Sequence, residues 1–203
     1  MNGSRDSVYL VRHGETAWSL TGQHTGLTDL PLTPHGDEQV RALAVRLAGL
    51  RFDHVLCSPL QRALRTCQLA GFGQAARLQA GLVEWNYGDY EGLTSTEIDR
   101  QRPGWDLFRD GCPGGESPAQ IGERADAVVS GLRSLAGRTI LFSSGHILRV
   151  LAARWLALSA EFGRSLVLDP AGVCILGYDH GAASVIRLWN DARRDRQPYL
   201  DGG

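Results

Sequence analysis

The sequence has no lysine, and all 21 of its basic side chains are arginine. With 22 acidic residues the formal net charge is −1, so the charge balance gives no reason to expect nucleic acid or an anionic membrane surface as a partner. Genome composition is one source of the arginine bias. Phosphate binding is a second, because a planar guanidinium holds a phosphate through two parallel hydrogen bonds.

Long apolar runs are also missing, and cysteines are few. No apolar stretch reaches the length of a transmembrane helix, and residues 1–7 hold no apolar core of a signal peptide. The four cysteines, Cys57, Cys67, Cys112 and Cys174, form no C-x-x-C pair and no zinc spacing with the histidines. We therefore expect a soluble cytoplasmic protein with free thiols.

Short apolar runs alternate with helix-start signals along the chain. The runs predict strands at residues 8–11, 55–57, 139–143, 173–178 and 184–188. Helices are predicted from 34, at 59–70, from 95, at 118–136 and at 146–158, with loops at 13–32, 82–93 and 102–116. Thr33, Ser58 and Ser117 each stand as an N-cap before a proline. The alternation predicts a single α/β domain over residues 1–203, with three α/β/α layers and a mainly parallel central sheet.

Two polar segments follow predicted strands of this sheet. Arg12–Gly14 comes directly after the first strand, and Ser144–His146 follows the strand at 139–143. In open α/β sheets ligands bind beyond the carboxyl ends of the strands. Both segments are therefore expected at the mouth of a functional site.

His13 is a candidate nucleophile. If a backbone carbonyl accepts a hydrogen bond from its Nδ1–H, Nε2 stays free, and a covalent intermediate on histidine splits one hard step into two easier ones. Arg12 could bind a phosphoryl oxygen, and Gly14 could let a substrate approach the backbone. A lone histidine is more often a surface or satisfied core residue, so this motif alone leaves both interpretations open.

Arg62 and Glu84 are further candidates. Arg62 lies in the first turn of a predicted helix, where a cation opposes the helix dipole, and this cost suggests a task such as phosphate binding. Glu84 precedes bulky aromatic residues, and a carboxyl in such surroundings can act as a general acid. A solvated arginine and an exposed loop carboxylate are the alternative interpretations.

Taken together, the segment Arg12–Thr16, Arg62 and the loop around Glu84 resemble the histidine phosphatase superfamily, which has the phosphoglycerate-mutase-like fold. The resemblance spans nearly the whole chain. Further segments resemble the branch that contains sedoheptulose-bisphosphatases and broad acid phosphatases: residues 23–33, 84–92, 109–112 and 114–117.

The resemblance implies a phosphatase that works through a phosphohistidine. His13 is expected to be the nucleophile, while Arg12 and Arg62 are expected to bind the phosphoryl group and stabilise its transition state. Glu84 is expected to protonate the leaving oxygen and then to take a proton from the attacking water. The resemblance implies no metal and no cofactor, because the cationic side chains stabilise the charge.

The resemblance also implies contacts with a small phosphorylated metabolite, a sugar phosphate or bisphosphate. Thr25, Gly26 and Tyr87 match positions at which the family contacts its substrate. Ser19 stands where the mutases have a phosphate-binding asparagine, so that contact is expected to be weaker or different. Arg109 could hold a second phosphate.

The resemblance breaks at Ser144. After the strand at 139–143 the family has a histidine immediately before a glycine. Alignment of that glycine with Gly145 puts Ser144 at the position of the histidine. His146 matches a second, non-catalytic histidine of the sugar-bisphosphatase-like branch. Ser144 could donate a neutral hydrogen bond in an enzyme slowed by on the order of 10²–10³. His146 could swing in, helped by the helix N-terminus. Alternatively the change, natural or engineered, leaves a protein that only binds phosphate ligands.

Two rival functions remain at this point. Phosphoglycerate mutases have a longer insertion between the Glu84 loop and segment 114–117, and a shorter cap favours hydrolysis because water reaches the phosphoenzyme more easily. A non-catalytic phospholigand sensor is supported by Ser144 alone. The apolar runs 150–153 and 173–176 are interpreted as core, although either could form the face of a homodimer.

Overall fold

The computed structural model describes residues 6–193 and Tyr199, and over these residues it has six strands: β1 (Ser7–Arg12), β2 (His54–Cys57), β3 (Ala76–Leu78), β4 (Arg138–Ser143), β5 (Val173–Asp179) and β6 (Ala183–Asp191). They form one sheet in the order β3-β2-β4-β1-β5-β6. β1 is parallel to β4, and β2 is parallel to β3 and β4. β5 and β6 add an antiparallel hairpin at one edge. The predicted mainly parallel sheet is confirmed.

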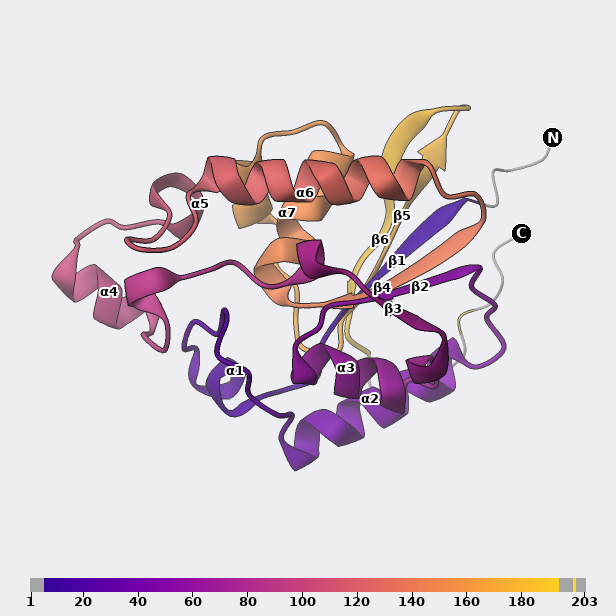
Figure 1. Cartoon of the computed structure of the whole chain (residues 1–203), viewed down its shortest axis with the longest axis horizontal. Coiled ribbons are helices and arrows are strands. Elements are labelled where there is room, and N and C mark those ends of the chain that lie inside the picture. Colours follow the sequence, from indigo (N-terminus) through magenta and orange to yellow (C-terminus); the bar gives the residue numbers. More distant parts are fainter. Residues whose placement is uncertain (1–5, 194–198, 200–203) are drawn as a thin grey trace.

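Helices cover both faces of this sheet. They are α1 (Ala17–Thr21), α2 (Pro34–Leu47), α3 (Gln61–Leu69), α4 (Ser95–Gln101), α5 (Leu107–Asp110), α6 (Pro118–Arg133) and α7 (Gly145–Trp155), with short 3₁₀ turns η1 (Gly73–Ala75), η2 (Ala80–Leu82), η3 (Gly88–Tyr90) and η4 (Ala160–Ser165). Figure 1 shows α2 and α3 against one face and α6 and α7 against the other, so the three-layer α/β/α prediction is confirmed. α1, α4 and α5 lie beyond the carboxyl ends of β1 and β4 (Figure 1).

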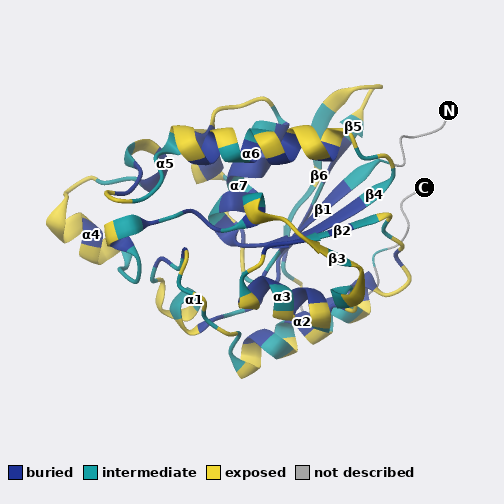
Figure 2. Cartoon of the chain, in the orientation of Figure 1, coloured by how far each residue is buried: buried dark blue, intermediate teal, exposed yellow. Residues whose placement is uncertain are grey.

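The central strand β1 contributes to two cores. Its Val8 and Leu10 join the apolar cluster under α6 and α7, and its Tyr9 and Val11 join the cluster over α2 and α3. A strand covered on both faces is apolar along its whole length, which explains the continuous run that predicted it. Figure 2 shows this buried centre between helices whose outer faces are exposed. Among the helices of residues 6–193, none has both the length and the apolar character needed to cross a membrane.

The N-caps predicted at Thr33 and Ser117 are confirmed. The Thr33 hydroxyl accepts a hydrogen bond from the backbone N–H of Gly36 at the start of α2. Ser117 forms a capping box with Gln120 at the start of α6. Because each cap satisfies backbone donors that the first helical turn leaves without partners, these two helices begin where the sequence predicts.

Other predictions of local structure are wrong. The segment 102–116, predicted as a loop, contains the short helix α5. Ser58 does not cap α3: that helix begins at Gln61, and its N-cap residue Leu60 makes no side-chain cap bond within the described residues. The segment 13–32 is not wholly loop, since α1 lies within it behind a capping box that Thr16 forms with Ser19. α1 buries none of its residues, so it carries no apolar periodicity to predict it.

The role expected for Gly14 also changes. A Cβ on Gly14 would lie 2.6 Å from the carbonyl oxygen of Gly36, and one on Gly36 would lie 2.3 Å from that of Glu15. The two glycines therefore let the loop after β1 pack backbone to backbone against the start of α2. Gly14 positions this loop, and the expected approach of a substrate is not what requires a glycine there.

Candidate active site

The site forms where β1 and β4 end side by side. Arg12 pairs with Ser143 at the last position of the parallel register. The backbone N–H of His13 then donates to the Ser143 carbonyl at 2.9 Å. This pairing brings His13 next to the N-terminus of α7, so the two segments singled out in the sequence meet as expected.

His13 is held as a buried, neutral imidazole. Its Nδ1 lies 2.7 Å from the Gly14 carbonyl oxygen, which can only accept, so Nδ1 carries the proton and Nε2 carries the lone pair. The residue is 4% exposed. Burial, with the nearby Arg12 and Arg62 guanidinium groups, holds the pKa of His13 well below its ordinary value. His13 therefore remains a neutral imidazole at neutral pH, with the lone pair of Nε2 available.

Arg12 has a buried donor that no described residue satisfies. Its Nη1 donates to the Leu168 carbonyl, while Nε is buried and has no partner among the described residues. A Cβ on Gly145 would lie 3.2 Å from this Nε, so the glycine makes room for the guanidinium. Burial lowers the pKa of Arg12, although Glu84 opposes the shift. A buried donor without a partner is costly, and a phosphoryl oxygen would satisfy it.

Arg62 is fully engaged with the protein. It is 0% exposed. Its Nη atoms donate to the carbonyls of Thr25, Gly26 and Thr28 at 2.8–3.1 Å. Its Nε donates to the Ser144 hydroxyl at 3.3 Å. Arg62 therefore adds a fixed positive charge beside His13, but within the described residues neither Arg62 nor Ser144 lines the cavity at the site.

Glu84 is anchored at the N-terminus of α7. One carboxylate oxygen accepts from the backbone N–H groups of Trp85 (2.9 Å) and Ile147 (2.8 Å), and the other accepts from that of His146 (2.9 Å). Ser144, the N-cap residue, makes no side-chain cap bond within residues 6–193. Glu84 therefore takes the place of the cap, where the positive end of the helix favours a carboxylate. This fixes the group at the wall of the cavity.

Aromatic rings form another wall of the cavity. The Tyr87 hydroxyl lies 2.6 Å from Nδ1 of His146, and the Tyr87 and His24 rings are 4.7 Å apart between centroids. Burial lowers the pKa of His24 to about 4 and puts that of His146 well below its ordinary value. Burial also raises the pKa of Tyr87 well above its usual range. This wall is therefore neutral and offers hydrogen bonds rather than charge.

These walls enclose a cavity of about 250 Å³. Most of the predicted residues line it: Arg12, His13, Ser19, Thr25, Glu84, Tyr87, Gly145 and His146. The volume suits a small polar molecule rather than a polymer. Nucleophile, cation and carboxylate thus face one space, which is the arrangement needed to transfer a phosphoryl group.

Arg109 lies away from this cavity, contrary to expectation. Its guanidinium bonds to the neighbouring Asp110 and to the Gly104 carbonyl, and its side chain is 57% exposed. Gly26 does not line the cavity either, and a Cβ there would lie 2.5 Å from the Trp85 carbonyl oxygen. Gly26 serves close packing, and Arg109 is not placed to hold a second phosphate.

The structure adds Arg149 and His24 to the site. Arg149 follows His146 by three residues, so both lie on the same face of α7. Its Nε and Nη2 donate to the carbonyls of Gly163 and Arg164, which hold the guanidinium at the cavity. The i, i+3 spacing from His146 could have indicated Arg149. His24 lies in the segment 23–33 that resembles the bisphosphatase branch, but no role was predicted for it.

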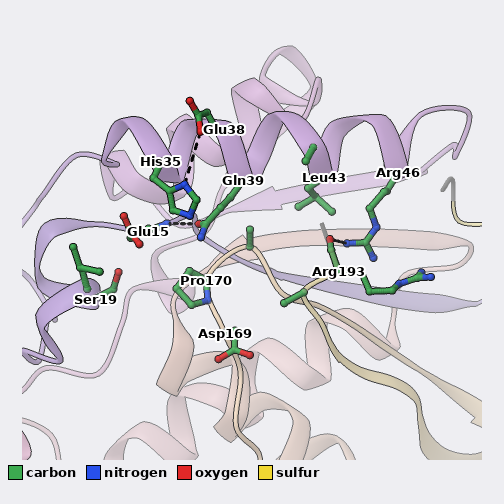
Figure 3. A pocket seen from close by; sticks show the side chains of 14 residues that line it. Glu15, Ser19, His35, Glu38, Gln39, Leu43, Arg46, Asp169, Pro170 and Arg193 are labelled. Carbon is green, nitrogen blue, oxygen red and sulfur yellow. Dashed lines mark hydrogen bonds and ion pairs between the residues drawn. The ribbon is translucent and has the colours of Figure 1, made fainter. Parts of the chain in front are cut away.

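A larger hollow of about 620 Å³ runs beside α2 (Figure 3). It shares Ser19 with the smaller cavity but holds neither His13 nor Glu84. Its His35 and Glu38 face each other with 44% and 73% of their side chains exposed. Its size does not make it the site, because no nucleophile is buried in it and its buried cation, Arg46, is already paired with Asp191.

No cluster of three or more histidine, cysteine, aspartate or glutamate side chains within residues 6–193 is arranged to hold a metal ion. The cations available to a ligand here are the guanidinium groups of Arg12 and Arg149.

Comparison with known proteins gives a consistent result. The model of the histidine phosphatase superfamily (branch 1) matches residues 8–192. An acid phosphatase of Mycobacterium tuberculosis is 42% identical over 185 residues, which are 89% of this chain and 91% of that protein. A sedoheptulose 1,7-bisphosphatase of Saccharomyces cerevisiae is 36% identical, covering 75% of this chain and 68% of the relative. A solved structure of the open reading frame Rv3214 product from Mycobacterium tuberculosis superposes with a TM-score of 0.86 at 37% identity, covering 91% of this chain and 96% of that one.

Proposed function

Because this chain belongs to the histidine phosphatase superfamily (branch 1), we propose that it hydrolyses a small phosphorylated metabolite through a phosphohistidine on His13. One observation carries the proposal: a buried imidazole, with Nδ1 held by a carbonyl, lines the same cavity as the Arg12 guanidinium and an anchored carboxylate.

In the first step, Nε2 of His13 attacks phosphorus and the bond to the leaving oxygen breaks. Arg12 lines the cavity, where its guanidinium can bind a phosphoryl oxygen. Arg62 contributes positive potential from behind the wall. Glu84 gives its proton to the leaving oxygen, so the metabolite departs as an alcohol.

In the second step, water attacks the phosphohistidine and the phosphorus–nitrogen bond breaks. Glu84, now a carboxylate, takes a proton from this water, and inorganic phosphate leaves. The three backbone N–H groups on Glu84 suit this second step, because they stabilise the carboxylate that takes the proton and hold it in one position. The same residue serves as acid and then as base.

We further propose a sugar phosphate or bisphosphate as the substrate. Gln23, Thr25 and Ser95 bring hydrogen-bonding groups to the cavity, and Arg149 supplies a second cation for a second phosphate or a carboxylate. The relatives named above are an acid phosphatase and a sedoheptulose bisphosphatase, which supports this class.

The test is phosphate release from a panel of sugar phosphates, sugar bisphosphates, phosphoglycerates and an aryl phosphate, with EDTA present. A parallel quench with labelled substrate should trap an acid-labile phosphoenzyme in the parent and none in His13→Ala. In Glu84→Gln turnover should fall by about 10²–10⁴. A parent whose phosphoenzyme survives acid treatment, or that still forms one in His13→Ala, would rule out the phosphohistidine.

A second candidate function follows from Ser144, which accepts from Arg62 and stays outside the cavity within the described residues. On this alternative the chain binds phosphorylated ligands without turning them over. It would be favoured if neither the parent nor Ser144→His released phosphate while both bound a phosphate analogue tightly.

A further inference from the structure

The end of β1 is hydrogen-bonded to a segment from elsewhere in the chain, residues 167–172, which we name the support loop. The Leu168 carbonyl accepts from the side chain of Arg12. The Gly172 carbonyl accepts from the backbone N–H of Arg12 at 3.1 Å. The loop therefore fixes Arg12 from both its main chain and its side chain.

The support loop also holds the backbone of the nucleophile. The N–H of Ala171 donates to the His13 carbonyl at 3.1 Å. Ala171 has a φ of +57°, a left-handed conformation that is unfavourable for a residue with a Cβ. Strained backbone of this kind persists only where the surroundings hold it, and it is common at functional sites.

A bulge in β6 supplies that hold. β5 and β6 pair at Val173 with Asp191 and at Ile175 with Leu188, so Trp189 and Asn190 together oppose a single β5 residue. Bulges redirect side chains and occur next to active sites. Asn190 has a φ of +53°, which asparagine tolerates better than most residues. Its side chain turns toward the support loop.

The bulge residues bond to the support loop at two points. Oδ1 of Asn190 accepts from the Asp169 N–H at 2.8 Å, and its Nδ2 donates to the Asp169 carboxylate at 2.9 Å. The indole of Trp189 donates to the Val167 carbonyl at 2.6 Å. A Cβ on Gly172 would lie 2.8 Å from Asn190 Oδ1, so the loop is shaped around this amide.

From this chain of contacts we infer that Asn190 and Trp189 are positioning residues for the phosphoryl pocket: through the support loop they set the placement of Arg12 and His13. The inference rests on the proposed function, since it assigns that pocket to phosphate. Neither residue lines the cavity within the described part of the chain, so they act only through the loop. The affinity of the pocket for a phosphoryl group should therefore depend on an edge strand that does not touch the ligand.

The test is a reciprocal exchange. Asn190→Asp places a carboxylate against Asp169 and removes the amide donor, while Asp169→Asn in the same chain restores a complementary pair. Orthovanadate binding by calorimetry, kcat and KM separately, and the urea midpoint are measured for both single variants and the double variant. The single variant Asp169→Asn is needed as well, because the negative charge of Asp169 raises the pKa of Arg12 and its loss could affect the pocket directly. Arg187→Ala, which removes another β6 side-chain bond to β5, is the matched control.

Asn190→Asp should weaken vanadate binding and kcat/KM by about tenfold, and the double variant should recover most of the loss. Arg187→Ala should change only the urea midpoint. The inference is overturned if Asn190→Asp lowers the urea midpoint but leaves vanadate affinity unchanged. It is also overturned if the double variant recovers neither vanadate affinity nor kcat/KM. If the parent releases no phosphate, the proposed function fails, yet vanadate binding still tests the positioning role.

Discussion

The two hollows that lie on either side of Ser19 differ more in chemistry than in size. The groove beside α2 is the larger, at about 620 Å³ against about 250 Å³. Its cations Arg46 and Arg193 both pair with Asp191, at 2.6 and 2.8 Å. Each hollow has an arginine whose buried Nε lacks a partner in the described chain, Arg12 in the cavity and Arg46 in the groove. Only the smaller cavity also buries a histidine and a carboxylate in its lining, since His13 and Glu84 are each 4% exposed.

The comparison shows that volume alone does not locate chemistry. Burying a titratable group costs free energy unless something compensates, so a cavity that buries several such groups has a reason to do so. In the groove, solvent and ion pairs supply that compensation. In the cavity a ligand can supply it, and substitutions of matched residues in the two hollows can separate these cases.

The largest contrast is expected between His13→Ala and His35→Ala. Removing the nucleophile should lower kcat/KM by at least about 10⁴-fold, because the other imidazoles of the cavity are engaged with protein partners, His24 with Ser95 and His146 with Tyr87. His35→Ala, in the groove, should leave kcat/KM within about twofold of the parent. Initial rates on the best substrate of the panel measure both. Equal losses in the two variants would mean that the groove takes part in the chemistry.

The pH profile sharpens this contrast. Because the pKa of His13 lies well below 6.5, its reactive neutral form should persist below that pH. The fall of kcat/KM on the acid side that belongs to His13 is therefore expected below pH 6.5, not at it. An acid limb centred at or above pH 6.5 would show that His13 is protonated more easily than its burial implies.

Ser144→His should give the next largest effect, a gain of about 10²–10³ in kcat if the pocket lacks one donor. The gain is expected because the Ser144 hydroxyl accepts a hydrogen bond from Arg62, and Ser144 is not among the described residues that line the cavity. His146→Gln, made in the parent and in Ser144→His, tests whether His146 substitutes for the missing imidazole. A cost in the parent that disappears in Ser144→His would mean that it does, and an equal cost in both would mean that it does not.

The fold was largely predictable because its signals are local. β1 and β4 are buried on both faces, so their continuous apolar runs predicted them to within a residue at each end. The starts of α2 and α6 were predicted from their N-cap residues, Thr33 and Ser117. α1 and the three-residue edge strand β3 bury little, and without an apolar pattern they were missed.

The site was predictable only where a residue follows a strand or repeats a family motif. His13, Arg12 and Glu84 were found in that way and lie together. Arg109 was misplaced because Asp110 beside it, rather than the cavity, receives its guanidinium. His24 reaches the cavity through contacts far along the chain, with Tyr87, and such contacts leave no mark in the local sequence.

His24 should make stability fall as the pH falls. Its pKa is 6.5 when unfolded and about 4 when folded, because burial disfavours the charged form. Below pH 6.5 the unfolded chain therefore binds a proton that the folded chain does not, so stability is lost between pH 6.5 and about 4. His24→Gln should remove on the order of 3 kcal/mol of this loss. Urea unfolding at pH 7, 6, 5 and 4 measures it, and parallel pH curves for parent and variant would contradict it.

Arg149→Met should weaken the binding of substrates with two anionic groups more than that of substrates with one. We expect KM to rise about tenfold for a sugar bisphosphate and by less for a monophosphate, since one charge-assisted pair is lost. Arg109→Met, the cation outside the cavity, is the control and should change neither. The urea midpoint of both variants shows how much of any change in KM comes from lost stability, because Arg149 also donates hydrogen bonds to the carbonyls of Gly163 and Arg164. A larger effect at Arg109 would restore the assignment that the structure rejects.

The smallest expected effect concerns the wall between the two hollows. Ala171 lines the groove on one side and holds the His13 backbone on the other. Ala171→Gly relieves a left-handed alanine, worth about 1 kcal/mol, but gives the unfolded chain about as much additional freedom, so the net stability change should stay within about 0.5 kcal/mol. Ala157→Gly, at a φ of +59° against +57° for Ala171, is the matched control at the end of α7. Only Ala171→Gly should lower kcat/KM, by about two- to threefold, because the glycine frees the segment that fixes the nucleophile. Equal activity in both variants and the parent would mean that the wall needs no fixed backbone, and that the hydrogen bonds from β6 alone keep the cavity in shape.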